Sequence, residues 1–60
     1  MTLPVAGDRI ELLSMPDDPD PIPTGSTGTV LWSTPEQVVV DWDIRRSLSL
    51  IVGVDRWRVL

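Results

Sequence analysis

The chain contains no cysteine and no histidine. Without cysteine it can form no disulfide, no thioether-linked haem and no thiolate metal site. A zinc site built from carboxylates alone would be unusual, because zinc prefers nitrogen and sulfur ligands. Lysine and tyrosine are also missing, so the serines have no nitrogen base to activate a hydroxyl nucleophile. We expect a protein that is not an enzyme and that holds no cofactor and no metal ion.

Long apolar runs are absent as well. A membrane-spanning helix needs about 18 or more consecutive apolar residues, and no such stretch occurs. The first residues lack the basic region and apolar stretch of a secretory signal, so the expected location is the cytoplasm. The 60 residues are expected to form one domain, residues 1–60. The formal net charge of −4 argues against a protein that coats duplex nucleic acid, since phosphate contacts dominate such binding.

Proline is concentrated in one place. Four of the six prolines fall within residues 15–24, where they alternate with Asp17, Asp18 and Asp20. Proline has no N–H to donate and a fixed φ, which excludes a helix or a central strand here. Residues 15–24 are therefore predicted to form a long extended loop, called the acidic loop below.

On both sides of this loop, polar and apolar residues alternate in short segments, as they do in half-buried strands. The predicted strands are residues 9–12, 29–32, 37–42, 47–51 and 56–59. Residues 33–36 are expected to form a hairpin turn, and residues 52–55 a tight turn with one 3-10 turn. Because closure hides exposed strand edges, the pattern favours an all-β, five-stranded SH3-like barrel.

Alternation along the strands also predicts the interior. The residues expected inside are Ile10, Leu12, Val30, Val38, Val40, Leu48, Leu50, Trp57 and Val59. Trp32 and Trp42 share faces with these residues and are expected to be at least partly buried. Gly25 is expected to serve as a turn residue and Gly28 to allow close approach of two strands, rather than to bind phosphate, since no P-loop pattern follows them.

Eight residues are candidate binding residues: Asp17, Asp18, Asp20, Trp32, Arg45, Arg46, Arg56 and Arg58. The aspartates form a solvated acidic loop, bind a cation, or accept backbone N–H groups that fix the loop. Trp32, next to the hairpin turn, is the best candidate for an exposed aromatic side chain. The four arginines form one cationic patch or a solvated face paired with Asp41, Asp43 or Asp55. Asp43 and Asp55 are interpreted as backbone caps at turns rather than catalytic acids.

Several segments together resemble a known family. They are Gly7-Asp8-Arg9-Ile10, Met15-Pro16-Asp17-Asp18-Pro19, Pro23-Thr24-Gly25-Ser26-Thr27-Gly28-Thr29-Val30, Val40-Asp41-Trp42-Asp43 and Gly53-Val54-Asp55-Arg56. Across residues 5–59 the chain is similar to a short bacterial and phage family described only as a domain of unknown function, DUF4314. The resemblance implies an SH3-like barrel and no established activity.

Three functions follow as hypotheses. In the first, an accessory protein of a bacterium, phage or other mobile element contacts one protein partner through the acidic loop and a nearby Trp32. In the second, a barrel binds nucleic acid through Arg45, Arg46, Arg56 and Arg58. In the third, an exposed edge strand makes the chain a homo-oligomer.

Overall fold

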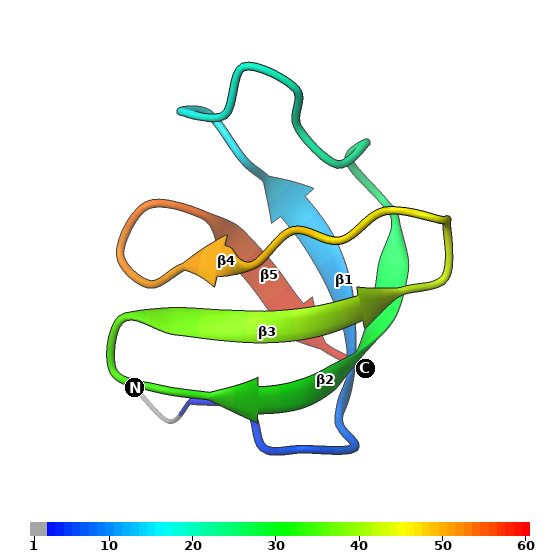
Figure 1. The fold of residues 1–60 in the computed structure, drawn as a ribbon, viewed down its shortest axis with the longest axis vertical. Helices are drawn as coiled ribbons and strands as arrows, with labels where there is room; N and C mark the ends of the chain where they lie inside the picture. Colours follow the sequence, from blue (N-terminus) through cyan, green and yellow to red (C-terminus); the bar gives the residue numbers. More distant parts are fainter. Residues whose placement is uncertain (1–2) are drawn as a thin grey trace.

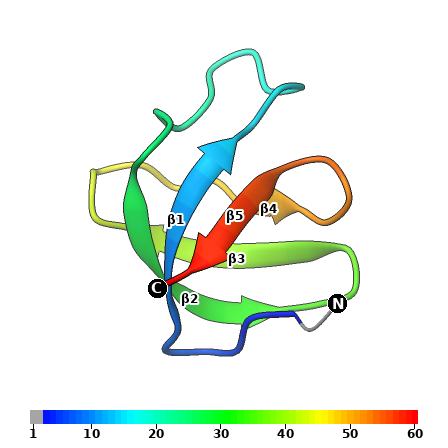
Figure 2. The same ribbon diagram turned by 180° about the vertical axis from the view of Figure 1, so that it is seen from behind.

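The computed structural model describes residues 3–60, which form an all-β structure. Five strands lie in a single antiparallel sheet with the order β4-β3-β2-β1-β5 (Figure 1). They are β1 (Arg9–Ser14), β2 (Thr27–Ser33), β3 (Gln37–Trp42), β4 (Leu50–Ile51) and β5 (Arg56–Val59). The first four strands follow one another as a meander, and β5 returns to pair with β1. The sheet curls strongly without closing, so that β4 and β5 are its two edges (Figure 2).

The last two elements differ from the sequence prediction. The fourth strand was expected over residues 47–51, but β4 covers only Leu50–Ile51, and Ser47 contributes an isolated bridge to Asp41. The preceding segment is held by a side chain instead, because Trp42 Nε1 donates to the Leu48 carbonyl at 2.8 Å. Residues 52–54 form the predicted tight turn, closed by Val54 N–H donating to the Ile51 carbonyl. It is not a 3-10 turn, because Gly53 has φ +89°.

A β-bulge in β2 corrects the prediction that Trp32 shares a face with the core residues and confirms Trp32 as an exposed aromatic side chain. Val30 pairs with Val40, but Trp32 pairs with Val39, so Leu31 is the extra residue in the strand. An extra residue reverses the inside–outside alternation beyond it. Trp32 consequently lies on the outer face with 55% of its surface exposed.

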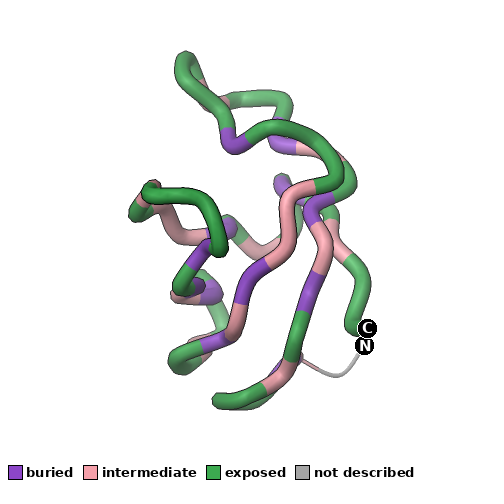
Figure 3. Tube along the Cα trace, turned by 90° about the vertical axis from the view of Figure 1, so that its right-hand side faces the viewer, coloured by how far each residue is buried: buried purple, intermediate pink, exposed green. Residues whose placement is uncertain are grey.

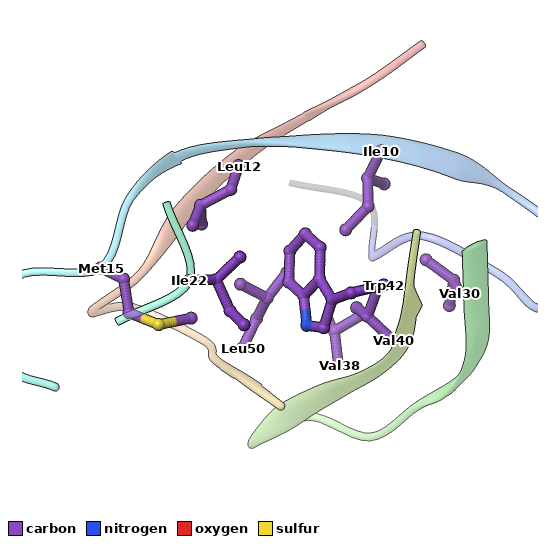
Figure 4. Close-up of a cluster of buried hydrophobic side chains, with 9 residues drawn as sticks. All are labelled: Ile10, Leu12, Met15, Ile22, Val30, Val38, Val40, Trp42 and Leu50. Atoms are coloured by element: carbon purple, nitrogen blue, oxygen red, sulfur yellow. The ribbon is translucent and has the colours of Figure 1, made fainter. Parts of the chain in front are cut away.

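Within residues 3–60 the core cluster contains nine buried apolar residues, and those in strands alternate with less buried ones (Figure 3). Trp42 lies in the middle of this cluster, and its ring faces core residues from several strands (Figure 4). The cluster consists of Ile10, Leu12, Met15, Ile22, Val30, Val38, Val40, Trp42 and Leu50. Leu48 and Trp57, predicted to be inside, are only partly buried and pack against it. The prediction for Val59 is wrong: it is 54% exposed, because β5 is an edge strand and no further strand covers it.

The acidic loop contributes two of the core residues, which sequence alternation did not predict. Met15 and Ile22 are both buried in the cluster although neither belongs to a strand. The end of the loop is fixed by Gly25 N–H, which donates to the Leu12 carbonyl. Gly25 has φ +91°, a conformation that side chains with a Cβ rarely adopt, so its predicted role as a turn residue is confirmed. The loop is therefore a lid on one end of the core with an exposed tip.

Gly28 permits the close contact of β2 with β3 that the sequence predicted. It pairs with Trp42, and an added Cβ would lie 2.9 Å from the Asp41 carbonyl oxygen and 3.0 Å from Trp42 Cα. Any larger residue would push the two strands apart.

Residues 3–60 include no helix of the length and apolarity that a membrane crossing requires.

Candidate functional site

The tip of the acidic loop holds three carboxylates in different surroundings. Asp18 Oδ1 accepts the Asp20 backbone N–H at 2.9 Å, which confirms the prediction that an aspartate fixes this loop. Asp20 is in turn held by Arg46, whose Nη2 lies 3.4 Å from its Oδ2 and donates to its carbonyl at 2.6 Å. Asp17 is exposed and makes no side-chain hydrogen bond to any described residue. Its carboxylate is thus open to a ligand without breaking a hydrogen bond to the described residues.

Two hollows meet beside this tip, and sequence reasoning had predicted neither. The larger, called the β5 groove below, has a volume of about 630 Å³ and is lined by Leu13, Val52, Gly53, Val54, Asp55, Arg56, Trp57 and Val59. The smaller, of about 110 Å³, is lined by Asp17, Asp18, Pro19, Ile51, Val54 and Asp55. Val54 and Asp55 line both, so the acidic tip and the β5 groove form one continuous surface.

A second β-bulge shapes the groove. In β1, Leu12 pairs with Trp57 and Ser14 with Arg56, so Leu13 is the extra residue. Its side chain is exposed and lines the β5 groove instead of entering the core. Sequence alternation alone gives no signal for such an extra residue.

The turn between β4 and β5 is held rigidly by Asp55. Its Oδ2 accepts the Ile51 N–H at 2.8 Å and its own N–H donates to the Ile51 carbonyl at 2.9 Å. Asp55 is 7% exposed, and these contacts confirm its predicted role as a backbone cap. The cap fixes Val54, which is 37% exposed, between the two hollows.

The aromatic residue on this surface is Trp57, not Trp32. Trp57 is half-buried, packs against the core and lines the β5 groove. Trp32 follows Thr27 by five residues, which is about 16 Å of strand at 3.3 Å per residue. Trp32 is the second-last residue of β2, a strand that runs away from the acidic loop (Figure 1). It lines neither hollow. The sequence expectation that Trp32 lies near that loop is therefore wrong, because β2 carries it away.

The four candidate arginines are divided between two parts of the fold. Arg45 and Arg46 lie in the connection between β3 and β4, while Arg56 and Arg58 lie on the edge strand β5. Arg58 Nε contacts Glu11 Oε1 at 2.5 Å across the β1–β5 pair, and Arg46 is held by Asp20. Asp20 and Glu11, rather than the expected Asp41, Asp43 and Asp55, are their partners. Arg45 and Arg56 have no ion pair with any residue in the described part of the chain.

A further ion pair, which sequence reasoning missed, involves Arg9 and Asp43. Arg9 donates to both Asp43 oxygens, at 2.8 and 2.5 Å, and Thr27 Oγ1 donates to Asp43 Oδ2 at 2.6 Å. The hydrogen bond from Arg9, and then that from Thr27, hold the pKa of the Asp43 carboxyl well below its usual range. Asp43 therefore binds side chains across β1 and β2 instead of capping backbone as predicted. Neither Arg9 nor Asp43 lines either hollow.

No group of three or more carboxylates between residues 3 and 60 is arranged to hold a metal ion. The surface is suited to binding through apolar and charged contacts. It consists of an apolar groove lined by Trp57, with carboxylates at one end and Arg56 in its lining.

Comparison with protein families places the chain. A family model for a domain of unknown function, DUF4314, matches residues 4–60, and the chain belongs to this family. A search of curated proteins and a search of solved structures each give no match.

Proposed function

We propose that this protein is a small, non-enzymatic binding module that contacts another protein through the acidic tip and the β5 groove. We propose an SH3-like barrel as its fold, since the strand order β4-β3-β2-β1-β5 and the curl of the sheet support it. Within this proposal it is a cytoplasmic accessory protein of a bacterium, a phage or another mobile element.

One observation carries the proposal: the two hollows share Val54 and Asp55. An exposed apolar groove is costly in water and is a common feature of protein-binding surfaces. Here it adjoins carboxylates that can orient a partner by charge. The surrounding scaffold is fixed by the Asp55 cap and by the two buried loop residues, Met15 and Ile22. Binding therefore requires little ordering of the protein, which favours affinity.

The alternative, a nucleic-acid-binding barrel, depends on the four arginines. Arg46 and Arg58 are already engaged by carboxylates, and a phosphate would have to displace Asp20 or Glu11. With a net charge of −4, the arrangement favours a protein partner. If nucleic acid were the partner, affinity would fall steeply as salt rises from about 50 to 200 mM, in proportion to the phosphates contacted.

The proposal is tested by affinity capture with two matched variants. Asp17→Asn removes one charge at the acidic tip, and Asp41→Asn removes one exposed charge that lines neither hollow. Tagged proteins are incubated with lysate of the cells that naturally make the protein, and recovered proteins are quantified by mass spectrometry.

We expect a specific partner whose recovery falls with Asp17→Asn and not with Asp41→Asn. A third variant, Val54→Thr, should also reduce recovery, because Val54 lines both hollows. Equal recovery by the wild type, Asp17→Asn and Val54→Thr would show that this surface is not the binding site.

A further inference from the structure

The free edge of β5 presents unpaired peptide groups along the β5 groove. Leu60 N–H donates to the Arg9 carbonyl, which makes Arg9 and Leu60 a hydrogen-bonded pair. In an antiparallel ladder, hydrogen-bonded and non-hydrogen-bonded pairs alternate, so the next hydrogen-bonded pair is Glu11 with Arg58. The N–H and C=O groups of Trp57 and Val59 therefore point away from β1, toward the free edge.

The lining of the groove places it over this edge. Arg56 and Trp57 are consecutive in a strand, so their side chains project to opposite faces, yet both line the β5 groove. Val59 lines it as well, from the face of Trp57. The groove therefore runs along β5, whose edge opposite β1 is free, and Leu13 of β1 lines it as well. A chain lying in the groove would thus meet the peptide groups of Trp57 and Val59.

Charge distinguishes between possible occupants. If a second copy paired its β5 antiparallel to this edge with Trp57 opposite Trp57, Arg56 of each copy would lie opposite Arg58 of the other, and Arg56 has no ion pair among the described residues. Like charges directly opposite each other disfavour such pairing. At the Val54 end of the groove, the carboxylates of Asp17 and Asp18 border the neighbouring hollow. Asp20 is paired with Arg46 at the surface, whereas Asp17 has no cationic partner among the described residues. A cationic side chain on an incoming strand complements this end.

We infer that the ligand is an extended segment of a partner protein that adds to β5 as a further strand. Its apolar side chains rest on Trp57 and Val59, and a lysine or arginine at one end reaches Asp17 and Asp18. Main-chain hydrogen bonds provide affinity in this mode and side chains in the groove provide selectivity. This inference rests on the proposed function, because it names the chemistry of the partner at the proposed surface.

The test begins with a display library of random heptapeptides selected on the immobilised wild-type protein. We expect enriched peptides to alternate apolar and polar residues and to carry lysine or arginine near one end. The tightest peptide is then synthesised in three forms: unmodified, with backbone N-methyl groups at alternate residues on one edge, and with the same groups on the other edge. One N-methylated form should bind at least about fivefold more weakly, because it loses two or more main-chain hydrogen bonds, and the other should bind as the unmodified peptide does.

The protein side is tested with the same peptide. Asp17→Asn should weaken binding about twofold to fivefold, as expected for one exposed ion pair, and Asp41→Asn should not change it. In ¹⁵N-resolved NMR spectra, the amides of Trp57 and Val59 should shift most and become protected from solvent exchange. Light scattering should show the protein as a monomer with or without peptide.

The other outcomes are equally decisive. Enriched peptides that are rich in proline or acidic residues, or equal affinities for all three backbone forms, would overturn strand addition. A dimer formed through β5 would do so as well. If a peptide binds but the protein amides that shift are not those of β5, this inference fails while a binding function survives. If the library yields no binder and affinity capture yields no partner, both proposals fail.

Discussion

Gly28→Ala is predicted to destabilise the protein through a clash with the neighbouring strand. The added methyl carbon would lie 2.6 Å from Val40 Cγ1, 2.9 Å from the Asp41 carbonyl oxygen and 3.0 Å from Trp42 Cα. A valine methyl can rotate away, but the other two atoms belong to the backbone of β3. Because Gly28 and Trp42 are paired in the sheet, relief requires the two strands to separate.

Overpacking of this kind typically costs about 1–3 kcal/mol. A protein of 60 residues has a free energy of unfolding of roughly 3–9 kcal/mol, at about 0.05–0.15 kcal/mol per residue. The variant therefore loses a large share of its stability. At about 4–8 °C per kcal/mol, a loss of about 2 kcal/mol lowers the melting temperature by roughly 8–16 °C. Thermal unfolding followed by far-UV circular dichroism measures the change, with urea titration as a second estimate.

Substitutions of Gly25 serve as a control for those of Gly28, because the two glycines are required for different reasons. No atom lies within 4 Å of a Cβ added there, but its φ of +91° strains residues other than glycine. Asparagine tolerates positive φ better than alanine, so at position 25 the Asn variant should be the more stable of the two. At position 28 the Ala variant should be the more stable of the two, because the smaller side chain clashes less with β3. A Gly28→Asn variant as stable as Gly28→Ala, or a Gly28→Ala variant within about 0.5 kcal/mol of wild type, would refute the clash.

Three further predictions concern the core, the ion pair and the tryptophans. Ile22→Ala removes a loop side chain from the core and should lower the free energy of unfolding by about 2–5 kcal/mol, measured by urea titration. A change below about 1 kcal/mol would mean that the loop does not cover the core. Because Arg9 lowers the pKa of Asp43 in the folded state, the pair stabilises the protein fully above the ordinary aspartate pKa of about 4 and progressively less as the pH falls below it. The melting temperatures of wild type and Asp43→Asn should accordingly converge on acidification, and a gap that widens would contradict the pair. Trp42→Phe changes a buried ring with a hydrogen-bonded indole N–H and should lower the free energy of unfolding by about 2 kcal/mol in urea titration. Trp32→Phe on the outer face should lower it by about 0.5 kcal/mol or less. Equal losses of stability would argue against the bulge.

The strands and most of the core could be predicted from sequence because alternation is a local signal. The β-branched run at Val38, Val39 and Val40 predicted β3 over residues 37–42, which are its bounds in the structure. The same rule failed for Trp32, where the extra residue Leu31 in β2 changes the face. A bulge is fixed by pairing with a strand elsewhere in the chain, so a single segment does not reveal it.

The site was harder to predict because its parts meet through long-range contacts. The three aspartates of the acidic loop were evident from composition, but their neighbours were not. Asp20 pairs with Arg46, and Asp17 lines the same hollow as Val54, only after the loop folds over the core. The burial of Met15 and Ile22 was also hidden, because proline-rich composition predicts a loop and says nothing about which of its residues turn inward.

The two inward-facing residues of the acidic loop separate its contribution to the core from its exposed span. Met15 and Ile22 anchor the loop, while residues 16–21 between them lie at the surface or near it. Lengthening such a tethered span is inexpensive, since each doubling of loop length adds only about 0.6 kcal/mol of closure entropy. Evolution, or an engineer, can therefore exchange this span for others of different charge and length while the buried core is left untouched.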